Sequence, residues 1–197
     1  MENDKITVCL IRHGITKGNL EGRYIGTTDE PLYDNKIQKA YPDADLVVSS
    51  PLKRCVSTAR LIYPENKIEI IEDFRETDFG RFEGKNYREL SGEPYYQKWI
   101  DSNGTLPFPD GESRECFIKR TNNAFNELIK TSFNRQKKYI TAVVHGGTIM
   151  AVLERNFGGD FYDYHIKNLE GYCFEVEVVC CNGQKNSYLY KIGRAHV

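Results

Sequence analysis

The chain has 197 residues, of which 40% are hydrophobic and 28% are charged, which suits one domain with a sizeable core. Its formal net charge of -1 excludes a bulk attraction to nucleic acid or to anionic membranes, so any phosphate recognition must be local. No window approaches transmembrane length and the first residues lack a secretory pattern, and we therefore expect a cytoplasmic protein, monomeric or homodimeric, without a membrane partner.

Strand-like and helix-like segments alternate along the chain. Apolar, β-branched runs predict central parallel strands at "KITVCLI" (5–11), "ADLVVSS" (44–50) and "KYITAVVHG" (138–146), with a further strand at "KIEII" (67–71). Apolar residues at helical spacing predict amphipathic helices over 51–63 and 113–133. These segments together indicate an α/β fold.

The end of the chain has a different pattern. "GYCFEVEVVC" (171–180) and "SYLYKI" (187–192), joined by the turn "NGQ", predict an edge hairpin. The prediction is therefore one three-layer α/β/α sandwich over residues 1–192, with a mostly parallel central sheet and a small helical cap at about 84–113. Residues 193–197 are predicted to be a disordered tail.

Polar clusters follow three of the predicted strands. Arg12-His13-Gly14 ends the first, Ser49-Ser50 ends the second with Arg54 in the next helix, and His145-Gly146-Gly147 ends the strand "ITAVV". Ligands of parallel α/β sheets bind beyond the carboxyl ends of the strands, so the three clusters should share one rim. The glycines permit close backbone approach, and the helix N-termini behind them offer amide donors to an anion.

The residue types at this rim suit phosphoryl transfer. Arg12 and Arg54 offer planar forks for phosphate oxygens, and a second imidazole adds a donor, which leaves one histidine free to attack phosphorus. The leaving alkoxide needs a proton, and "FRETDFGRFEG" offers Glu76, Asp78 and Glu83, among which spacing alone does not choose. His165 and His196 have no comparable setting and are expected at the surface.

These residues carry a resemblance to the histidine phosphatase superfamily, also called the phosphoglycerate mutase-like family. "LIRHGITKGN", "SSPLKRCVSTAR", "RETDFGRFEG" and "VVHGGTIMAVL" are similar to its four blocks, in the expected order. The resemblance implies that His13 is phosphorylated, that Glu76 is the proton donor, and that no metal or other cofactor is needed. It also implies a phosphate site made of Arg12, Asn19, Arg54, His145 and Gly146.

The motifs of other phosphatase classes fit the sequence less well. Cysteine phosphatases need five residues between cysteine and arginine, whereas four separate Cys55 from Arg60. "DADLV" (43–47) matches an aspartyl phosphatase motif but precedes its strand, which places the carboxylates at the wrong rim. No P-loop and no zinc-type histidine spacing is present.

Substrate choice is expected to lie in the less regular segments. "EGRYIGTTDEPL" should form one wall, with Arg23, Tyr24 and Thr27 as candidate substrate contacts, although a solvated loop around a buried tyrosine fits equally. In the cap, Tyr95, Tyr96 and Trp99 either stack on a substrate ring or pack the helix down, and packing is the commoner fate. The short segment that replaces a family helix, "YDNKIQKAYP", should alter one side of the domain.

The short cap resembles the phosphatase branch of the family, including the α-ribazole phosphatases. The expected function is a metal-independent phosphomonoesterase acting on a small phosphorylated metabolite, with α-ribazole 5'-phosphate as the specific candidate. A cofactor-dependent phosphoglycerate mutase and a non-catalytic phosphate-binding module remain as alternatives. The six cysteines lack CxxC pairs and are expected to be reduced and mostly buried.

Overall fold

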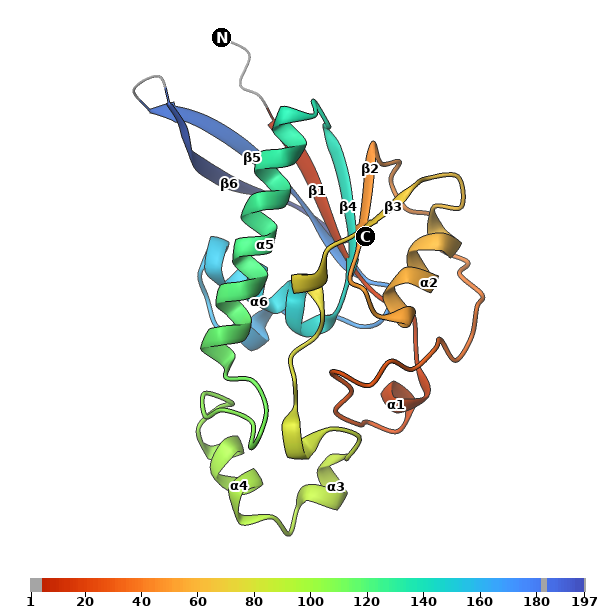
Figure 1. Ribbon diagram of the computed structural model, residues 1–197, viewed down its shortest axis with the longest axis vertical. Helices are drawn as coiled ribbons and strands as arrows, with labels where there is room; N and C mark the ends of the chain where they lie inside the picture. The colour runs from red at the N-terminus through yellow and green to blue at the C-terminus, as the bar shows by residue number, and fades with distance from the viewer. Residues whose placement is uncertain (1–4, 182–183, 197) are drawn as a thin grey trace.

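The computed structural model describes residues 5–181 and 184–196 (Figure 1). The strands are β1 (Lys5–Arg12), β2 (Leu46–Ser49), β3 (Ile68–Ile70), β4 (Tyr139–Val144), β5 (Gly171–Cys181) and β6 (Gln184–His196). The α-helices are α1 (Lys17–Leu20), α2 (Lys53–Ile62), α3 (Tyr87–Leu90), α4 (Pro94–Asp101), α5 (Arg114–Asn134) and α6 (Gly146–Phe157). Short 3₁₀ helices are η1 (Glu72–Phe74), η2 (Gly80–Phe82) and η3 (Phe161–Tyr164).

The strands form one sheet in the order β3-β2-β4-β1-β5-β6. The pairs β3-β2, β2-β4 and β4-β1 are parallel, whereas β5 and β6 are antiparallel additions at one edge. This arrangement confirms the predicted mostly parallel sheet with a C-terminal hairpin. The predicted disordered tail is wrong for residues 193–196, which continue β6, and residue 197 and the turn residues 182–183 lie outside the described residues.

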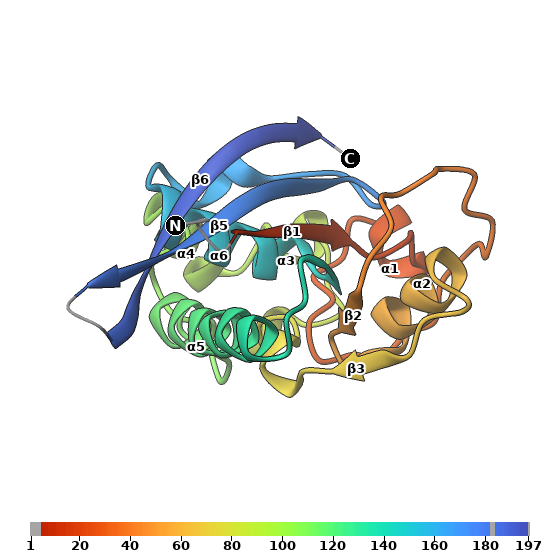
Figure 2. The same cartoon turned by 90° about the horizontal axis from the view of Figure 1, so that it is seen from above.

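Helices cover both faces of the sheet, with α5 and α6 on one side and α2 on the other (Figure 2). Alternate residues of each strand point to opposite faces, so the apolar runs fill two separate cores. The larger core joins β1, β4, α5 and α6 through residues such as Val8, Phe125 and Ile149. The smaller one packs α2 against the sheet through Cys55, Ala59 and Tyr63. The predicted three-layer architecture is therefore confirmed.

The segment 84–113 stands apart from the sheet as the predicted cap, at the bottom of Figure 1. It contains α3 and α4, and its apolar residues form a small, largely aromatic core together with Phe82. Tyr96 and Trp99 are buried in that core, whereas Tyr95 on the same helix is exposed. The packing interpretation therefore holds for Tyr96 and Trp99. The replaced family segment at 33–42 contains no helix.

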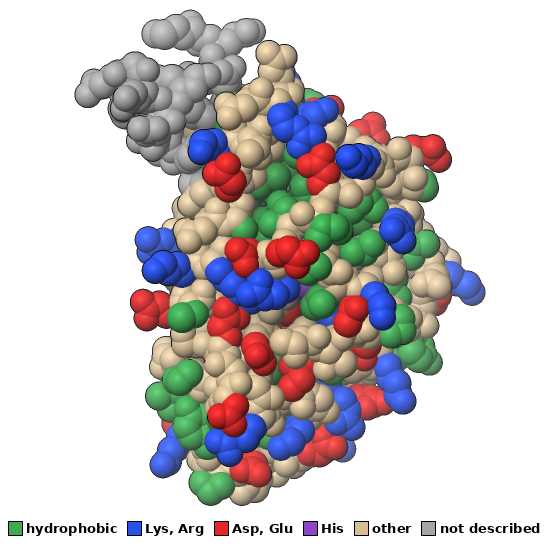
Figure 3. Space-filling view, in the orientation of Figure 1, with side chains coloured by type: hydrophobic (Ala, Val, Ile, Leu, Met, Phe, Trp, Pro, Cys, Tyr) green, Lys and Arg blue, Asp and Glu red, His purple; other side chains and the backbone are tan. Residues whose placement is uncertain are grey.

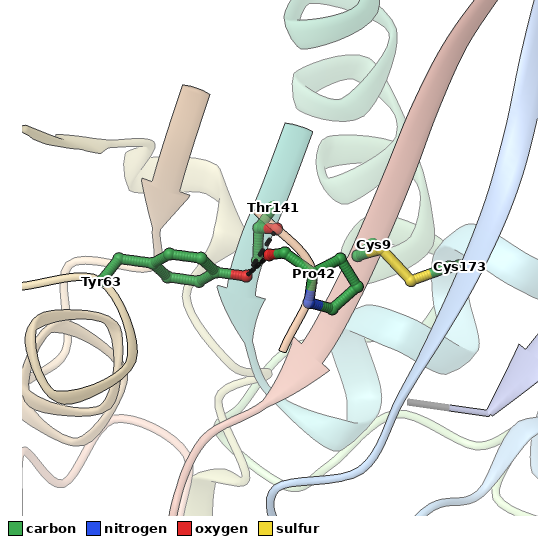
Figure 4. Close-up of a disulfide and its surroundings, with 5 residues drawn as sticks. All are labelled: Cys9, Pro42, Tyr63, Thr141 and Cys173. Carbon is green, nitrogen blue, oxygen red and sulfur yellow. Dashed lines mark hydrogen bonds between the residues drawn. A yellow bond between two sulfur atoms is a disulfide. The ribbon is translucent and has the colours of Figure 1, made fainter. Parts of the chain in front are cut away.

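The expectation of six reduced cysteines is wrong for one pair, because Cys9 of β1 is bonded to Cys173 of β5 (Figure 4). The two residues are register partners in neighbouring antiparallel strands, with Cα atoms 4.1 Å apart. Their 164-residue separation in sequence gives no local signal for this pairing. Cys55 is free and buried, and Cys116 is free but exposed.

Figure 4 also shows the Tyr63 hydroxyl, which donates to the Pro42 carbonyl at 2.8 Å.

Within the described part of the chain, no helix combines the length and the apolar character needed to cross a membrane. Basic and acidic side chains are interspersed on the face of the molecule that Figure 3 shows. This mixture agrees with the near-zero net charge of the sequence.

Candidate active site

The three predicted polar clusters lie at one rim because β2, β4 and β1 are parallel neighbours in the sheet. The register pairs Arg12 with Val144 and Ser49 with Val143. Beyond these pairs, the His13 amide donates to the Val144 carbonyl at 2.9 Å and the Ser50 amide to the Val143 carbonyl at 3.1 Å. Backbone hydrogen bonds thus continue past the strand ends and hold the clusters together.

His13 is buried with only 4% of its surface exposed. Its Nδ1 lies 2.7 Å from the Gly14 carbonyl oxygen. A carbonyl can only accept, so Nδ1 carries the proton and the neutral ring keeps its lone pair on Nε2. Burial, together with the positive charge of Arg54, lowers the pKa of His13 well below its usual value. His13 is therefore a neutral imidazole with a free Nε2 lone pair, which is the form a nucleophile requires.

His145 lies beside His13, with ring centroids 5.2 Å apart and ring planes at 67°. Its Nε2 is 2.7 Å from the Ser50 hydroxyl, and its Nδ1 accepts from Arg54 Nε at 3.3 Å. Acceptance at Nδ1 places the proton on Nε2, which then donates to Ser50. Burial and Arg54 lower the pKa of His145 well below its usual value. Both nitrogens have protein partners, so a phosphate contact at His145 requires the exchange of one of them.

Arg54 is fixed by the backbone of the loop that follows α1. Its Nη1 donates to the Thr28 carbonyl at 2.8 Å and its Nη2 to the Gly26 carbonyl at 2.9 Å. The side chain is 1% exposed, so these carbonyls replace water around the charge. Glu83 in turn accepts from the amides of Gly26 and Thr28, both at 2.9 Å, which holds the loop in place. Nη2 also donates to the Ile25 carbonyl at 3.3 Å and Nε donates to His145, so one of the five N–H groups of Arg54 remains for an anion.

Arg12 lies against the start of α6. Its Nη1 donates to the Ile166 carbonyl at 2.6 Å, and its buried Nε has no hydrogen-bond partner among the described residues. The place of a Cβ on Gly146 is 3.4 Å from that Nε, an ordinary contact distance, so the guanidinium lies beside the first residue of α6. Burial lowers the pKa of Arg12, although an arginine remains charged. The orphaned Nε and the first amides of α6 are suited to an anion.

The structure distinguishes among the three candidate acids. Asp78 accepts from the Gly80 amide at 2.8 Å, and Glu83 supports the loop under Arg54. Glu76 is 9% exposed and accepts from the amides of Thr77 at 3.0 Å and Gly147 at 3.1 Å. Burial outweighs these bonds and raises the pKa of Glu76. Only Glu76 of the three also lines the cavity described below.

Asn19 is held at the rim by a capping box at the start of α1. Its Oδ1 accepts from the Thr16 amide at 3.2 Å and from Asn168 Nδ2 at 3.0 Å. The Nδ2 donors are therefore the part of the side chain that remains for a phosphate oxygen. Asn168 also donates to the His13 carbonyl at 3.0 Å, so it ties the two predicted residues together.

A cavity of about 320 Å³ opens beside Arg12 and Glu76 and extends toward the cap. Seven of its sixteen lining residues are Phe, Tyr or Trp, and Tyr24 is one of them. His165, exposed as predicted, lies at its outer part. Two of the three predicted substrate contacts are placed elsewhere: Arg23 pairs with Glu89 at 2.7 Å, and Thr27 is exposed. The lining residues are Arg12, Tyr24, Glu76, Thr77, Phe79, Trp99, Gly104, Phe108, Arg114, Phe117, Gly146, Gly147, Met150, Phe161, Tyr162 and His165.

Two residues near the site were not singled out from the sequence. Asn168 donates to Asn19 Oδ1 and to the His13 carbonyl. Arg120 donates to the Glu76 carbonyl at 3.0 Å and pairs with Glu112 at 2.7 Å, so it fixes the backbone of Glu76. Neither residue stands at the end of a predicted strand, whereas Ser50, which does, bonds His145.

Within residues 5–181 and 184–196, no three His, Cys, Asp or Glu side chains come together in a way that could hold a metal ion. The positive charges that act on His13 are those of Arg54 and Arg12.

Comparison with known proteins identifies the family. The model of the histidine phosphatase superfamily (branch 1) matches residues 8–188. The uncharacterized phosphatase PhoE of Bacillus subtilis (strain 168) is 32% identical over 165 residues, which are 78% of each protein. The adenosylcobalamin/alpha-ribazole phosphatase of Escherichia coli (strain K12) is 30% identical over 162 residues, 76% of this chain and 78% of that protein. A solved phosphoserine phosphatase mutant from Entamoeba histolytica is 28% identical, covers 94% of both chains and has a TM-score of 0.74.

The chain therefore belongs to the histidine phosphatase superfamily, branch 1. The family and its phosphatase members make it a phosphoric monoester hydrolase of the histidine type.

Proposed function

We propose that this protein hydrolyses a small phosphorylated metabolite through a phosphohistidine at His13, without a metal ion. The observation that carries the proposal is the state of His13: a buried neutral ring with its proton fixed on Nδ1 and positive charge from Arg54 and Arg12 around it. A phosphoryl dianion drawn by that charge meets the free Nε2 lone pair.

The first half of the reaction transfers the phosphoryl group to the protein. Arg12, Arg54 and Asn19, with the Gly146 amide at the start of α6, bind the phosphate oxygens. Nε2 of His13 attacks phosphorus, the ester P–O bond breaks, and Glu76 gives its proton to the leaving oxygen. The raised pKa of Glu76 supports this role, because it keeps part of the carboxyl protonated closer to neutral pH.

The second half returns the site to its starting state. The Glu76 carboxylate removes a proton from water, the water oxygen attacks phosphorus, and the N–P bond to His13 breaks. Inorganic phosphate leaves, His13 is again neutral, and Glu76 is again protonated. The positive charge that each transfer needs is supplied by Arg12 and Arg54.

The first substrate to test is α-ribazole 5'-phosphate, because a relative that is 30% identical carries alpha-ribazole phosphatase in its name. A panel of phosphorylated metabolites, α-ribazole 5'-phosphate among them, should release inorganic phosphate, and the best ester identifies the substrate. A mutase would instead isomerise a monophosphoglycerate in the presence of its bisphosphate with little free phosphate. A binding module would bind an ester without turning it over.

The decisive experiment traps the phosphorylated protein. Rapid quenching with a ³²P-labelled ester should give an acid-labile, alkali-stable label that maps to the peptide containing His13. His13→Ala should lose both label and activity. The exposed His165 provides the matched control, since His165→Ala should still be labelled at His13. A label on a cysteine or a carboxylate, or full activity in His13→Ala, would refute the mechanism.

A further inference from the structure

We propose that the cavity beside Glu76 selects phosphate esters whose alcohol carries a flat aromatic ring with a hydrogen-bond acceptor, and that Trp99 supplies the donor. This inference rests on the proposed phosphatase function and names the substrate class for the same site. It is carried by the aromatic walls of the cavity, by the unpaired indole N–H of Trp99, and by the neutralised charge of Arg114.

Several rings in the walls of the cavity contact one another edge to face. The Phe79 ring centroid lies 5.0 Å from that of Phe108 with ring planes at 86°, and 5.2 Å from that of Tyr24 with ring planes at 62°. A ligand ring in the cavity, beside these rings, can add the offset and edge-to-face contacts that aromatic pairs favour. A small hydrated alcohol would lose water against these walls and gain few contacts in return.

The cavity is also large enough for a ring. Its volume is about 320 Å³. An apolar cavity of roughly 150 Å³ in another protein binds benzene, so the space here accommodates a six-membered ring together with the atoms that link it to the phosphoryl group.

Trp99 contributes a specific polar group to this apolar wall. Its side chain is buried, and its Nε1 has no hydrogen-bond partner among the described residues. The indole nitrogen is a donor only, and a buried donor without a partner is unfavourable. Trp99 lines the cavity, and its indole atom Cζ2 lies 3.2 Å from the place of a Cβ on Gly104, another lining residue. A ligand acceptor would satisfy the N–H.

Arg114, a cation that lines the cavity, does not favour an ester whose alcohol carries a negative charge. Arg114 pairs with Glu154 at 3.0 Å and its guanidinium lies 4.4 Å from the centre of the Phe161 ring. The Glu154 carboxylate already balances its charge, and the Phe161 ring covers one of its faces. Esters of carboxylate-bearing alcohols, such as phosphoserine and 3-phosphoglycerate, are therefore expected to be poor substrates.

The test uses esters that differ only in the alcohol. Propyl phosphate, 2-phenylethyl phosphate and the three 2-(pyridinyl)ethyl phosphates are all esters of unactivated primary alcohols, so they make similar demands on Glu76. We expect kcat/KM for the phenylethyl ester to exceed that for the propyl ester by roughly tenfold or more. The best pyridinyl isomer should gain about a further threefold to tenfold from the hydrogen bond.

Two variants on α4 separate the donor from the fold. Trp99→Phe keeps a ring but removes the N–H, and it should abolish the pyridinyl preference while preserving the preference for a ring. Tyr95→Phe is the matched control, because the Tyr95 hydroxyl donates to the Pro107 carbonyl at 2.9 Å and the residue does not line the cavity. That variant should retain both preferences. Equal kcat/KM for propyl and phenylethyl esters, or a pyridinyl preference that survives in Trp99→Phe, would overturn the inference.

A binding measurement distinguishes failure of this inference from failure of the proposed function. Trp99 is the single tryptophan of the chain, so its fluorescence reports on this wall alone. In His13→Ala, the pyridinyl ester should change the Trp99 emission at concentrations where propyl phosphate does not. The same titration decides the matter if Trp99→Phe does not fold. Hydrolysis of all esters at similar rates, with no selective change in emission, would refute the inferred substrate class but not the phosphatase function. Selective changes in emission without turnover would support the substrate class and refute the phosphatase function.

Discussion

Substitution of Glu76 by glutamine tests its proposed role as general acid, because phosphate esters differ in how much their leaving groups need a proton. An alkyl alcohol leaves poorly as an alkoxide and needs a proton, whereas p-nitrophenolate leaves readily without one. General acid catalysis contributes about a hundredfold to ten-thousandfold. Glu76→Gln should therefore slow phosphoryl transfer from propyl phosphate by an amount in that range, and transfer from p-nitrophenyl phosphate by far less.

The structural cost of the same substitution can be assessed from the contacts of Glu76. The carboxyl accepts from the amides of Thr77 and Gly147, one with each oxygen. Glutamine keeps one acceptor and turns an NH₂ group toward the other amide, which costs about 1–3 kcal/mol of stability. This loss affects both substrates equally, so the ratio of the two transfer rates isolates the chemistry.

The assay follows the transfer step itself. Single-turnover mixing with propyl phosphate and the burst of nitrophenol from p-nitrophenyl phosphate give the two rates. With the activated ester the variant should also accumulate phosphorylated His13, because the carboxylate that activates water is gone. Asp78→Asn provides a control, since Asp78 only supports the Gly80 amide and should show no difference between substrates. Equal losses for the two esters in Glu76→Gln would refute the assignment.

Three further predictions concern the cations, the disulfide and the histidines. Activity should be insensitive to EDTA and inhibited by vanadate, because Arg12 and Arg54 supply the positive charge; loss in EDTA restored by a divalent ion would contradict this. Reduction of Cys9–Cys173, which closes a 164-residue span, should lower the free energy of unfolding by roughly 2–5 kcal/mol, and Cys9→Ser should be insensitive to the reductant. Because the folded pKa of His13 is lowered, the stability from its neutral form is present above pH 6.5 and is lost as pH falls below it. Tm should therefore fall less steeply between pH 6.5 and 5 in His13→Ala than in the wild type, because the slopes of the two free energies of unfolding differ by at most about 1.4 kcal/mol per pH unit, the value for one proton; parallel profiles would contradict the shift.

The rim could be predicted because its signals are local. A strand that is buried on both faces is typical of a parallel sheet. A polar residue and a glycine that follow such a strand are therefore expected at the carboxyl end of the sheet, as for Arg12, His13 and His145. The parallel direction of β1, β2 and β4 follows from the alternation of strands and helices, whereas their order in the sheet does not. The acid could not be chosen in this way, because Glu76, Asp78 and Glu83 share one irregular segment and differ only in their tertiary partners.

The loop that was predicted as a wall of the site has a structural contact that the sequence does not indicate. The substrate contacts of its side chains stay predictions, but the carbonyls of Gly26 and Thr28 accept from Arg54. Every residue has a carbonyl, so composition carries no information about which one bonds a buried cation. The same reason explains the disulfide between Cys9 and Cys173, because strand register is a tertiary property.

The burial of the rim determines how its charges are distributed before a substrate arrives. Two imidazoles and two guanidinium groups lie close together, and burial among cations favours the form with the least positive charge. The arginines cannot lose a proton, so the histidines remain neutral: the pKa values of His13 and His145 are both lowered, with Arg54 as a cause in each. In the proposed mechanism, the positive charge is thereby kept on the arginines that bind phosphate, and the lone pair is kept on the His13 ring that attacks it. A protonated His13 would add to the attraction for a dianion but could not react, so the burial that orders the rim favours the form of His13 that the proposed mechanism needs.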